Sequence, residues 1–490
     1  MTSLFTLLAV SWLTAAPAAA PTGLVVRIDG DTLTLRARNT PLQDVLAAFV
    51  QAGVTVKADP DLDARVTGSV KDMDLSQALD ELLGPFGYAL IFDVVPGPLG
   101  NLERLEEIQV FRREGPRRIE PFMPETNFRI TRGPAAGSPE FVADEILIAF
   151  KPGTDIDAFR RLIAQIGGTV IDSAPDLGIY RIRLPLNTNI LALVELLKNN
   201  PIVSRVEPNY AYRLPGQAPS LAAAIGDAPP VAAAAKPGVP PVAVFDSGLR
   251  AVPGLDGLVA GAYDAIRPER SIEDRAGHGT QMALIASGAI APYGSEGSAD
   301  GVPVIAVRTF DDNGYTSNFT LMRAIDYAAS QGAKVLNMSW GSETDSSFLE
   351  TAMQAAQARG LVVVASAGNE PTGKPVYPAA YPGVISVSAL NSDGTPWDQS
   401  NHGASVTIAA PGTASFPVGH QGPPGGYAGT SIASAYVARN VALYLGENPS
   451  ATATQAKQAL LRTASPAPTA TVRYGSGTLD AAAVNRLLAP

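Results

Sequence analysis

The chain has 490 residues, of which 46% are hydrophobic and 17% charged, and this length suits roughly two to four domains that each bury a core. A disordered or fibrous protein is therefore not expected, and the net charge of −10 gives no positive field for binding nucleic acid. Cysteine is absent, which excludes disulfides, thiolate metal ligands and cysteine nucleophiles. Imidazole chemistry must use one of the three histidines, His278, His402 or His420.

The chain begins with a pattern typical of a secretory signal peptide. Residues 4–13 form an apolar run too short to span a bilayer, and Ala16-Pro17-Ala18 then provides an A-x-A cleavage site. We therefore expect a signal peptide over residues 1–18 and an exported chain, periplasmic or extracellular. The alternative is a buried N-terminal helix, because no Lys or Arg precedes the apolar run. No later segment is apolar for 18 residues, so we expect no membrane span in the mature chain.

Residues 24–95 contain two copies of a strand, helix and strand pattern. The first helix is predicted to begin after Thr40 and to end at Gly53, and the second to begin after Asp74 and to end at Gly87. The apolar positions repeat at helical spacing in both copies: Leu42, Val45, Leu46 and Phe49, then Leu75, Ala78, Leu79 and Leu82. The pattern resembles the short N-terminal domain of secretins and TonB-dependent receptors, which implies a partner in a Gram-negative envelope. A generic small α+β domain accounts for it equally well.

The next three segments are predicted as two linkers with a compact domain between them. Residues 100–137 mix Arg with Glu, Pro and Gly, as solvated linkers or exposed hairpins do; we treat them as a linker and assign them no function. Over residues 139–213 the pattern predicts the order β-α-β-β-α-β of a ferredoxin-like sheet, which by itself says nothing about function. Residues 214–240 are small and Pro-rich and predict an exposed linker, where proteolytic cleavage is expected.

From residue 241 onward, apolar strands alternate with helical patterns, as a parallel α/β sheet requires. The first strand runs directly into Asp246, and catalytic groups in such sheets collect at the carboxyl ends of strands. His278 lies between Gly277 and Gly279 at the start of a predicted helix, and these glycines allow the backbone to approach its ring closely. Taken alone, each segment would be only a turn or a cap.

Two further segments present groups suited to stabilising an oxyanion. Asn369 follows the apolar strand 362–365 in a tight Gly turn, where its amide can donate to a developing negative charge. Ser431 follows Gly429 and Thr430 and begins a helix of small residues, whose first amides and positive dipole end also favour an anion.

Taken together and in this order, the motifs around Asp246, His278, Asn369 and Ser431 resemble those of the subtilisin-like serine proteases, the subtilase family. The resemblance covers roughly residues 241–485. It implies an α/β fold, a subtilisin-like parallel sheet flanked by helices, preceded by two small α+β domains. It also implies that Ser431 is the nucleophile, His278 the general base, Asp246 the group that orients the imidazole, and Asn369 an oxyanion donor.

The resemblance also bears on substrate binding and on regulation. Ser339, Trp340 and Gly341 look like the strand that pairs with an extended peptide substrate, and Val376 stands where relatives often have Gly at the floor of the primary specificity pocket. A β-branched floor would favour Ala or Val over Phe immediately before the scissile bond. Residues 139–213 are similar to subtilase pro-domains, which implies an intramolecular inhibitor and a self-processing zymogen.

Other positions are interpreted as having no part in the chemistry. Gln281 and Ala435 stand where relatives commonly have His and Pro, and His402 and His420 are interpreted as surface residues. No cofactor is expected for catalysis. Structural calcium is common in the family, but no EF-hand-type loop appears, and residues 311–314 are interpreted as a turn.

Two functions remain open from the sequence. The chain is either an exported serine endopeptidase that hydrolyses peptide bonds, or an envelope binding or regulatory protein. In the second case residues 24–95 would carry the function and the peptidase fold would be a silent scaffold. The presence of all four motifs favours the enzyme.

Overall fold

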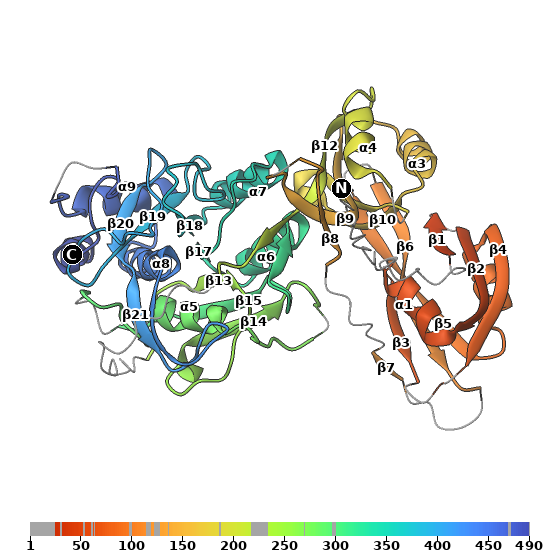
Figure 1. Ribbon diagram of the computed structural model, residues 1–490, viewed down its shortest axis with the longest axis horizontal. Helices are drawn as coiled ribbons and strands as arrows, with labels where there is room; N and C mark the ends of the chain where they lie inside the picture. Colours follow the sequence, from red (N-terminus) through yellow and green to blue (C-terminus); the bar gives the residue numbers. More distant parts are fainter. Residues whose placement is uncertain are drawn as a thin grey trace, which may run out of the picture. The chain divides into compact units, whose positions relative to one another are not determined.

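The computed structural model describes residues 25–489 of the chain. It leaves out residues 30–31, 52–53, 60–61, 63, 98–99, 114–118, 122–127, 136, 186–187, 217–233, 269, 296–299 and 469–471. The predicted signal peptide and most of the predicted linker 214–240 lie outside the described residues. The described residues form two compact units, one within residues 25–94 and 103–121, and the other within residues 95–102 and 128–489 (Figure 1). Among the helices described, none has the length and apolar character needed to cross a membrane.

The first unit contains the two predicted strand, helix and strand copies. Asp74 caps the second helix, because its Oδ1 accepts hydrogen bonds from the backbone N–H groups of Ser76 (3.0 Å) and Gln77 (3.1 Å). The apolar faces predicted for both helices are buried in one core. The elements are β1 (Val25–Asp29), β2 (Thr32–Pro41), α1 (Leu42–Gln51), β3 (Thr55–Ala58), β4 (Arg65–Asp74), α2 (Leu75–Leu83), β5 (Gly87–Gly97), β6 (Gly100–Phe111) and β7 (Glu120–Pro121). They form the sheets β1-β2-β4 and β5-β6-β3-β7.

The linker prediction is wrong for the first part of residues 100–137. β6 pairs in parallel with β3 and buries Leu105, Ile108 and Val110 in the core of the unit. Glu107 lies in this strand, and Lys57 of β3 holds it in an ion pair of 2.8 Å. A carboxylate that is paired can be buried. This stretch therefore forms a strand although its high charge is typical of a linker.

The ferredoxin-like sheet predicted for residues 139–213 is confirmed, with the order β10-β11-β9-β12 and all pairs antiparallel. One face packs on its own helices, and the other face packs in a core shared with the helices of the peptidase region. The elements are β8 (Ile130–Arg132), β9 (Glu140–Phe150), α3 (Ile156–Gln165), β10 (Thr169–Ala174), the 3-10 helix η1 (Pro175–Leu177), β11 (Ile179–Arg183), α4 (Ile190–Lys198) and β12 (Val203–Arg213).

The peptidase region is built on a seven-stranded parallel sheet, as predicted. Its strands, in spatial order, are β14 (Val259–Asp264), β15 (Val304–Arg308), β13 (Val242–Asp246), β17 (Val335–Met338), β18 (Val362–Ser366), β19 (Ile385–Leu390) and β20 (Ile408–Pro411). The order of the strands reverses beside β13, and ligands bind at such switch points, outside the carboxyl ends of the strands. Asp246 is the last residue of β13.

Helices cover both faces of this sheet, so each strand is buried on both sides. Val242 and Val244 face the core formed with α5 (His278–Ser287) and α8 (Thr430–Glu447). Ala243 and Phe245 face the core formed with α6 (Asn318–Ser330) and α7 (Ser347–Ala358). The remaining elements are the 3-10 helix η2 (Asp256–Leu258), β16 (Tyr315–Ser317), β21 (Thr413–Phe416), β22 (Gly425–Ala428), α9 (Ala453–Thr463) and α10 (Ala481–Leu487).

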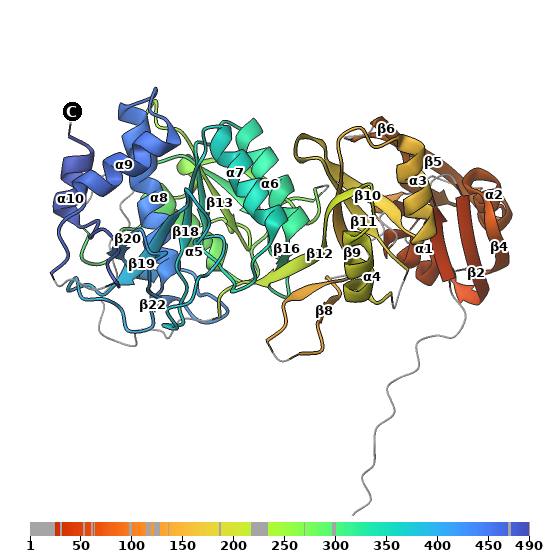
Figure 2. The same ribbon diagram turned by 90° about the horizontal axis from the view of Figure 1, so that it is seen from above.

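The ferredoxin-like sheet docks on α6 and α7 through the amino ends of both helices (Figure 2). Glu207 of β12 accepts hydrogen bonds from the Ser346 hydroxyl (2.6 Å) and the Ser347 backbone N–H (2.9 Å) at the start of α7. Asn209 of the same strand accepts one from the Phe319 N–H in the first turn of α6 (3.2 Å). These groups satisfy helix-start amides that have no carbonyl partner within the helix.

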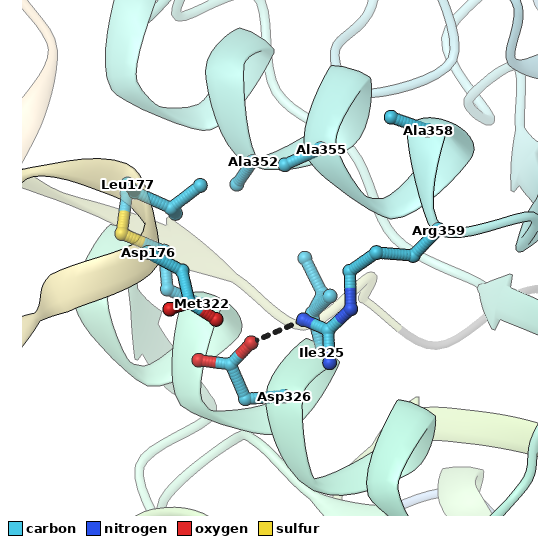
Figure 3. A pocket seen from close by; sticks show the side chains of 9 residues that line it. All are labelled: Asp176, Leu177, Met322, Ile325, Asp326, Ala352, Ala355, Ala358 and Arg359. Carbon is cyan, nitrogen blue, oxygen red and sulfur yellow. Dashed lines mark hydrogen bonds and ion pairs between the residues drawn. The ribbon is translucent and has the colours of Figure 1, made fainter.

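A cavity of about 300 Å³ lies beside this contact, between α6, α7 and η1 (Figure 3). Leu177 of η1 points toward Ala352 of α7, and Arg359 and Asp326 form an ion pair of 2.6 Å at the other side. The ferredoxin-like domain therefore rests on the two helices without filling the groove between them.

Candidate active site

Asp246 and His278 are joined by a hydrogen bond of 2.7 Å between Asp246 Oδ1 and His278 Nδ1. The carboxylate is fixed at the end of β13, where the same oxygen also accepts the Ser247 N–H (2.8 Å). Only 1% of Asp246 and 4% of His278 is exposed. The contact at Nδ1 leaves the other ring nitrogen, Nε2, for a second partner, as a general base requires.

A residue that sequence analysis missed, Asp274, holds the loops of both groups together. Its Oδ1 accepts from Ser247 Oγ (2.8 Å) and the Gly277 N–H (2.7 Å), and its Oδ2 accepts from the Thr280 N–H (2.9 Å) and hydroxyl (2.6 Å). Asp274 is 3% exposed, so these bonds form away from water. One buried carboxylate therefore ties the segment after Asp246 to the start of the helix that carries His278.

The glycines on either side of His278 are required by close backbone contacts, as predicted. A Cβ on Gly277 would lie 2.0 Å from the Gly419 carbonyl oxygen, and the backbone there has φ +85°. A Cβ on Gly279 would lie 2.4 Å from the Gly248 carbonyl oxygen. Any larger residue at either position would displace the histidine or the loop beside it.

Ser431 lies in the first turn of α8, and its hydroxyl donates to the Ser339 carbonyl at 2.9 Å. Since a hydroxyl has one proton, the serine does not donate to His278 in this arrangement, and rotation about its Cα–Cβ bond would be needed. The Ser431 N–H belongs to the first turn of a helix, where amides lack intrahelical partners and carry a partial positive charge.

Asn369 is oriented by Thr430, the residue before the serine. Its Oδ1 accepts from the Thr430 N–H (3.0 Å) and from the Thr430 hydroxyl (2.8 Å). The oxygen of the carboxamide is thereby committed, and Nδ2 is the atom available to donate to another acceptor. Asn369, Ser431 and His278 line the same small cavity, so the structure brings the four predicted residues to one edge of the sheet.

Of the residues predicted to bind substrate, Ser339 is part of the structural framework, whereas Val376 lies between two loops. The Ser339 side chain is buried and contacts Ser434 Oγ at 3.1 Å, so it supports the first turn of α8. The Val376 side chain occupies the space between two glycine-bearing loops. A Cβ on Gly341 would lie 2.3 Å from one Val376 methyl, and a Cβ on Gly368 3.4 Å from the other.

Comparison with known proteins shows the family to which this chain belongs. The thermophilic serine proteinase of Bacillus sp. (strain AK1) is 32% identical over 323 residues, which is 62% of this chain and 78% of that protein. Residues 240–478 match the subtilase family. The chain belongs to the subtilase family. It is a serine protease by this relationship, and subtilisin Savinase from Lederbergia lenta is 33% identical over 248 residues, 50% of this chain and 90% of that protein.

The domain before the peptidase region also has a known counterpart. Residues 131–209 match the fervidolysin N-terminal prodomain. The crystal structure of fervidolysin from Fervidobacterium pennivorans superposes with a TM-score of 0.58 at 21% identity, over 74% of this chain and 63% of that one. At this identity the likeness shows the shared fold.

In this subtilase the end of the prodomain strand runs into the candidate active site. β12 pairs antiparallel with β16, Tyr212 opposite Thr316 and Arg213 opposite Tyr315, and the Leu214 N–H donates to the Gly314 carbonyl at 2.8 Å. Pro215 and Gly216 then line the cavity with His278, Asn369 and Ser431. The chain leaving the prodomain therefore passes the candidate nucleophile.

The interpretation of His420 as a surface residue is wrong. It is 3% exposed, and its ring centroid lies 4.6 Å from that of His278. Its burial, and then the charge of His278, lower the pKa of His420 to about 3. His402, also interpreted from the sequence as a surface residue, is half-buried beside Gly373. Across the described residues, no group of three or more His, Cys, Asp or Glu side chains is arranged to hold a metal ion.

Proposed function

We propose that this subtilase is an exported serine endopeptidase made as a self-processing zymogen. The observation that carries the proposal is the 2.7 Å hydrogen bond from His278 to Asp246 beside a cavity that also contains Ser431 and Asn369. This geometry supports the catalytic roles described next, which use only side chains and backbone groups of the chain.

In the first step, Ser431 Oγ turns from Ser339, gives its proton to His278 Nε2 and attacks the carbonyl carbon of the peptide bond. The negative charge that develops on the carbonyl oxygen is stabilised by Asn369 Nδ2 and the Ser431 N–H. Asp246 stabilises the imidazolium. His278 then donates the proton to the leaving amine, the acyl-enzyme forms, and water, activated by the same histidine, releases the acid.

The path of the prodomain supports the zymogen part of the proposal. The segment from Tyr212 to Gly216 is held by β16 and reaches the cavity of Ser431, so it occupies the place of a substrate and blocks access. We expect cleavage between residues 213 and 241, in the part nearest Gly216. The freed prodomain would then act as an inhibitor of its own peptidase.

We further propose that Val376 limits the primary specificity pocket. Its two methyl groups lie against the positions of Gly341 and Gly368, which favours Ala or Val over Phe before the scissile bond. Paired Ala and Phe peptides should differ in kcat/KM by roughly tenfold or more. Equal turnover of the two would contradict this role of Val376.

A second candidate function concerns the N-terminal unit, for which the sequence suggested an envelope partner. β5 is an edge strand, and Ile91, Phe92 and Val94 on it are exposed, which favours a binding role for this unit. A variant with Asp or Lys at these three positions would be expected to lose retention by envelope fractions and to keep its peptidase activity. A structural calcium ion remains a prediction without a location.

The test of the main proposal compares wild type with Ser431→Ala by intact mass, N-terminal sequencing and fluorophosphonate labelling. Wild type should be cut and labelled, and Ser431→Ala should be uncut and unlabelled. Ser386→Ala is a matched control, because it removes a buried hydroxyl from the strand β19, outside the contacts that hold Ser431, and should still be labelled. A folded wild type that is neither cut nor labelled would favour the silent scaffold.

A further inference from the structure

The prodomain strand places Tyr212 in a pocket of the peptidase region. Tyr212 is 1% exposed, and its ring centroid lies 5.4 Å from that of Trp340, with the ring planes inclined by 34°. Phe310 packs edge-on against the same tryptophan at 5.8 Å. Trp340 and Phe310 belong to the peptidase and are fully buried, so the walls of the pocket are rigid and aromatic.

The far end of this pocket is polar. The Tyr212 hydroxyl donates to Asn318 Oδ1 at 2.6 Å, and Asn318 is completely buried at the first position of α6. The orientation of the carboxamide follows from its other contact, since Nδ2 donates to Ser346 Oγ at 2.8 Å and Ser346 donates in turn to Glu207 at 2.6 Å. With Glu207 in place, Asn318 therefore presents an acceptor to the side chain that fills the pocket.

One continuous segment, from Tyr212 to Pro215, reaches from this pocket to the catalytic cavity. Tyr212 lies opposite Thr316, and Pro215, three residues further on, lines the cavity with Ser431. A substrate that binds β16 in the same register would place its side chain at the Tyr212 position between Trp340 and Asn318. Hydrophobic side chains would fill the aromatic part, but only a hydroxyl would satisfy the buried oxygen.

We propose that Asn318 makes this subtilase select substrates with tyrosine at the position that Tyr212 occupies in the prodomain. This inference rests on the proposed endopeptidase function. Phenylalanine has nearly the same shape, but it would displace water from Asn318 Oδ1 without replacing the hydrogen bond. A site built around such a hydrogen bond rejects the analogue that lacks the hydroxyl.

The test uses quenched fluorescent peptides with the sequence of residues 206–220, which retain Glu207, and with Tyr, Phe or Leu at position 212. Self-processed enzyme is titrated with fluorophosphonate so that kcat/KM refers to active sites. Wild type should prefer Tyr to Phe by roughly tenfold or more. A peptide with Phe at position 210 is the matched control, because Tyr210 lies on the same strand and is only half-buried, and it should change kcat/KM less than about twofold.

Variants at Asn318 assign the preference to one atom. Asn318→Leu removes the acceptor and should bring the Tyr to Phe ratio close to one, whereas Asn318→Asp retains an acceptor and should keep the preference for Tyr. Equal cleavage of Tyr and Phe peptides by wild type would overturn the inference even if no variant folds. A preference that survives in Asn318→Leu would also overturn it. Absence of both labelling and cleavage in wild type would instead overturn the proposed function, and the inference with it.

Discussion

The two halves of the candidate active site are held in place by different kinds of contact. Asp246 and His278 are fixed by side-chain hydrogen bonds, to each other and through the four bonds that Asp274 accepts from their loops. Asn369 and Ser431 are fixed by the first turn of α8, through Thr430 and the Ser339 carbonyl. The base is thus already assembled, whereas the hydroxyl must rotate before it can react.

This difference separates the consequences of damage to each half. A change in the Asp246 half should disturb the protonation and orientation of His278, because a charged network positions the ring. A change in the Ser431 half should affect the stabilisation of the transition state and leave the base intact. Kinetic and thermodynamic measurements can therefore tell the two halves apart.

The largest effect is expected for Asp246→Asn. The amide cannot hold His278 as the hydrogen-bonded tautomer or stabilise its positive charge, so kcat should fall by about 10⁴-fold. Asp264→Asn is the matched control, since Asp264 is a buried aspartate at the end of β14, two strands away from β13 in the same sheet, and is paired with Arg308 at 2.6 Å. It should still be labelled by fluorophosphonate at a rate near that of wild type. A comparable kcat loss in both variants would contradict a specific role for Asp246.

Asn369→Asp should lower kcat by about 10²- to 10³-fold, with a smaller change in KM. The carboxylate keeps an oxygen for the Thr430 N–H and hydroxyl, but it loses the Nδ2 donor and repels the oxyanion. This substitution therefore removes the Nδ2 donor and keeps the contact with Thr430. Peptide hydrolysis at saturating substrate measures the effect, and an unchanged kcat would remove Asn369 from the oxyanion site.

Asp274→Asn should weaken the fold around the base by on the order of 2–3 kcal/mol, because an amide group would face the Thr280 N–H. Denaturant unfolding in the Ser431→Ala background avoids self-digestion. Asp326→Asn breaks the half-exposed ion pair with Arg359 and should cost less than about 1 kcal/mol. If both substitutions cost the same, Asp274 is not the anchor of this half.

Local patterns in the sequence were enough for the parts of the site that motifs carry. Asp246 follows an apolar strand, and His278 and Ser431 begin helices, so each could be placed at the edge of the sheet before any coordinates. Asp274 could not be identified in this way, because its role depends on joining the start of α5 to Ser247, which lies 27 residues before Asp274 in the chain. A single aspartate four residues before a histidine gives no pattern that distinguishes it.

The wrong predictions for β6 and His420 share one physical cause, which is contact between segments that are distant in the sequence. β6 looked like a linker because Glu107 is charged, and only Lys57 on another strand explains its burial. His420 looked exposed because its neighbours are Gly and Pro, yet its loop folds over the helix start, where the Gly419 carbonyl meets Gly277. Local composition predicts the exposure of a segment correctly only when the segment does not pack against a distant part of the chain.

The response to acid also distinguishes the halves, and it involves His420, which packs on His278. Its pKa is about 3 in the folded chain, so it stays neutral there, while the unfolded chain takes up a proton below about pH 6.5. This residue therefore makes the fold lose stability as pH falls from 6.5 to 3, by at most about 1.4 kcal/mol per pH unit. In the Ser431→Ala background, His420→Gln should lose less stability between pH 7 and pH 4 than the parent chain, as followed by denaturant unfolding. Parallel curves for the two chains would mean that the acid response arises elsewhere, and that the Asp246 half is no more sensitive to pH than the Ser431 half.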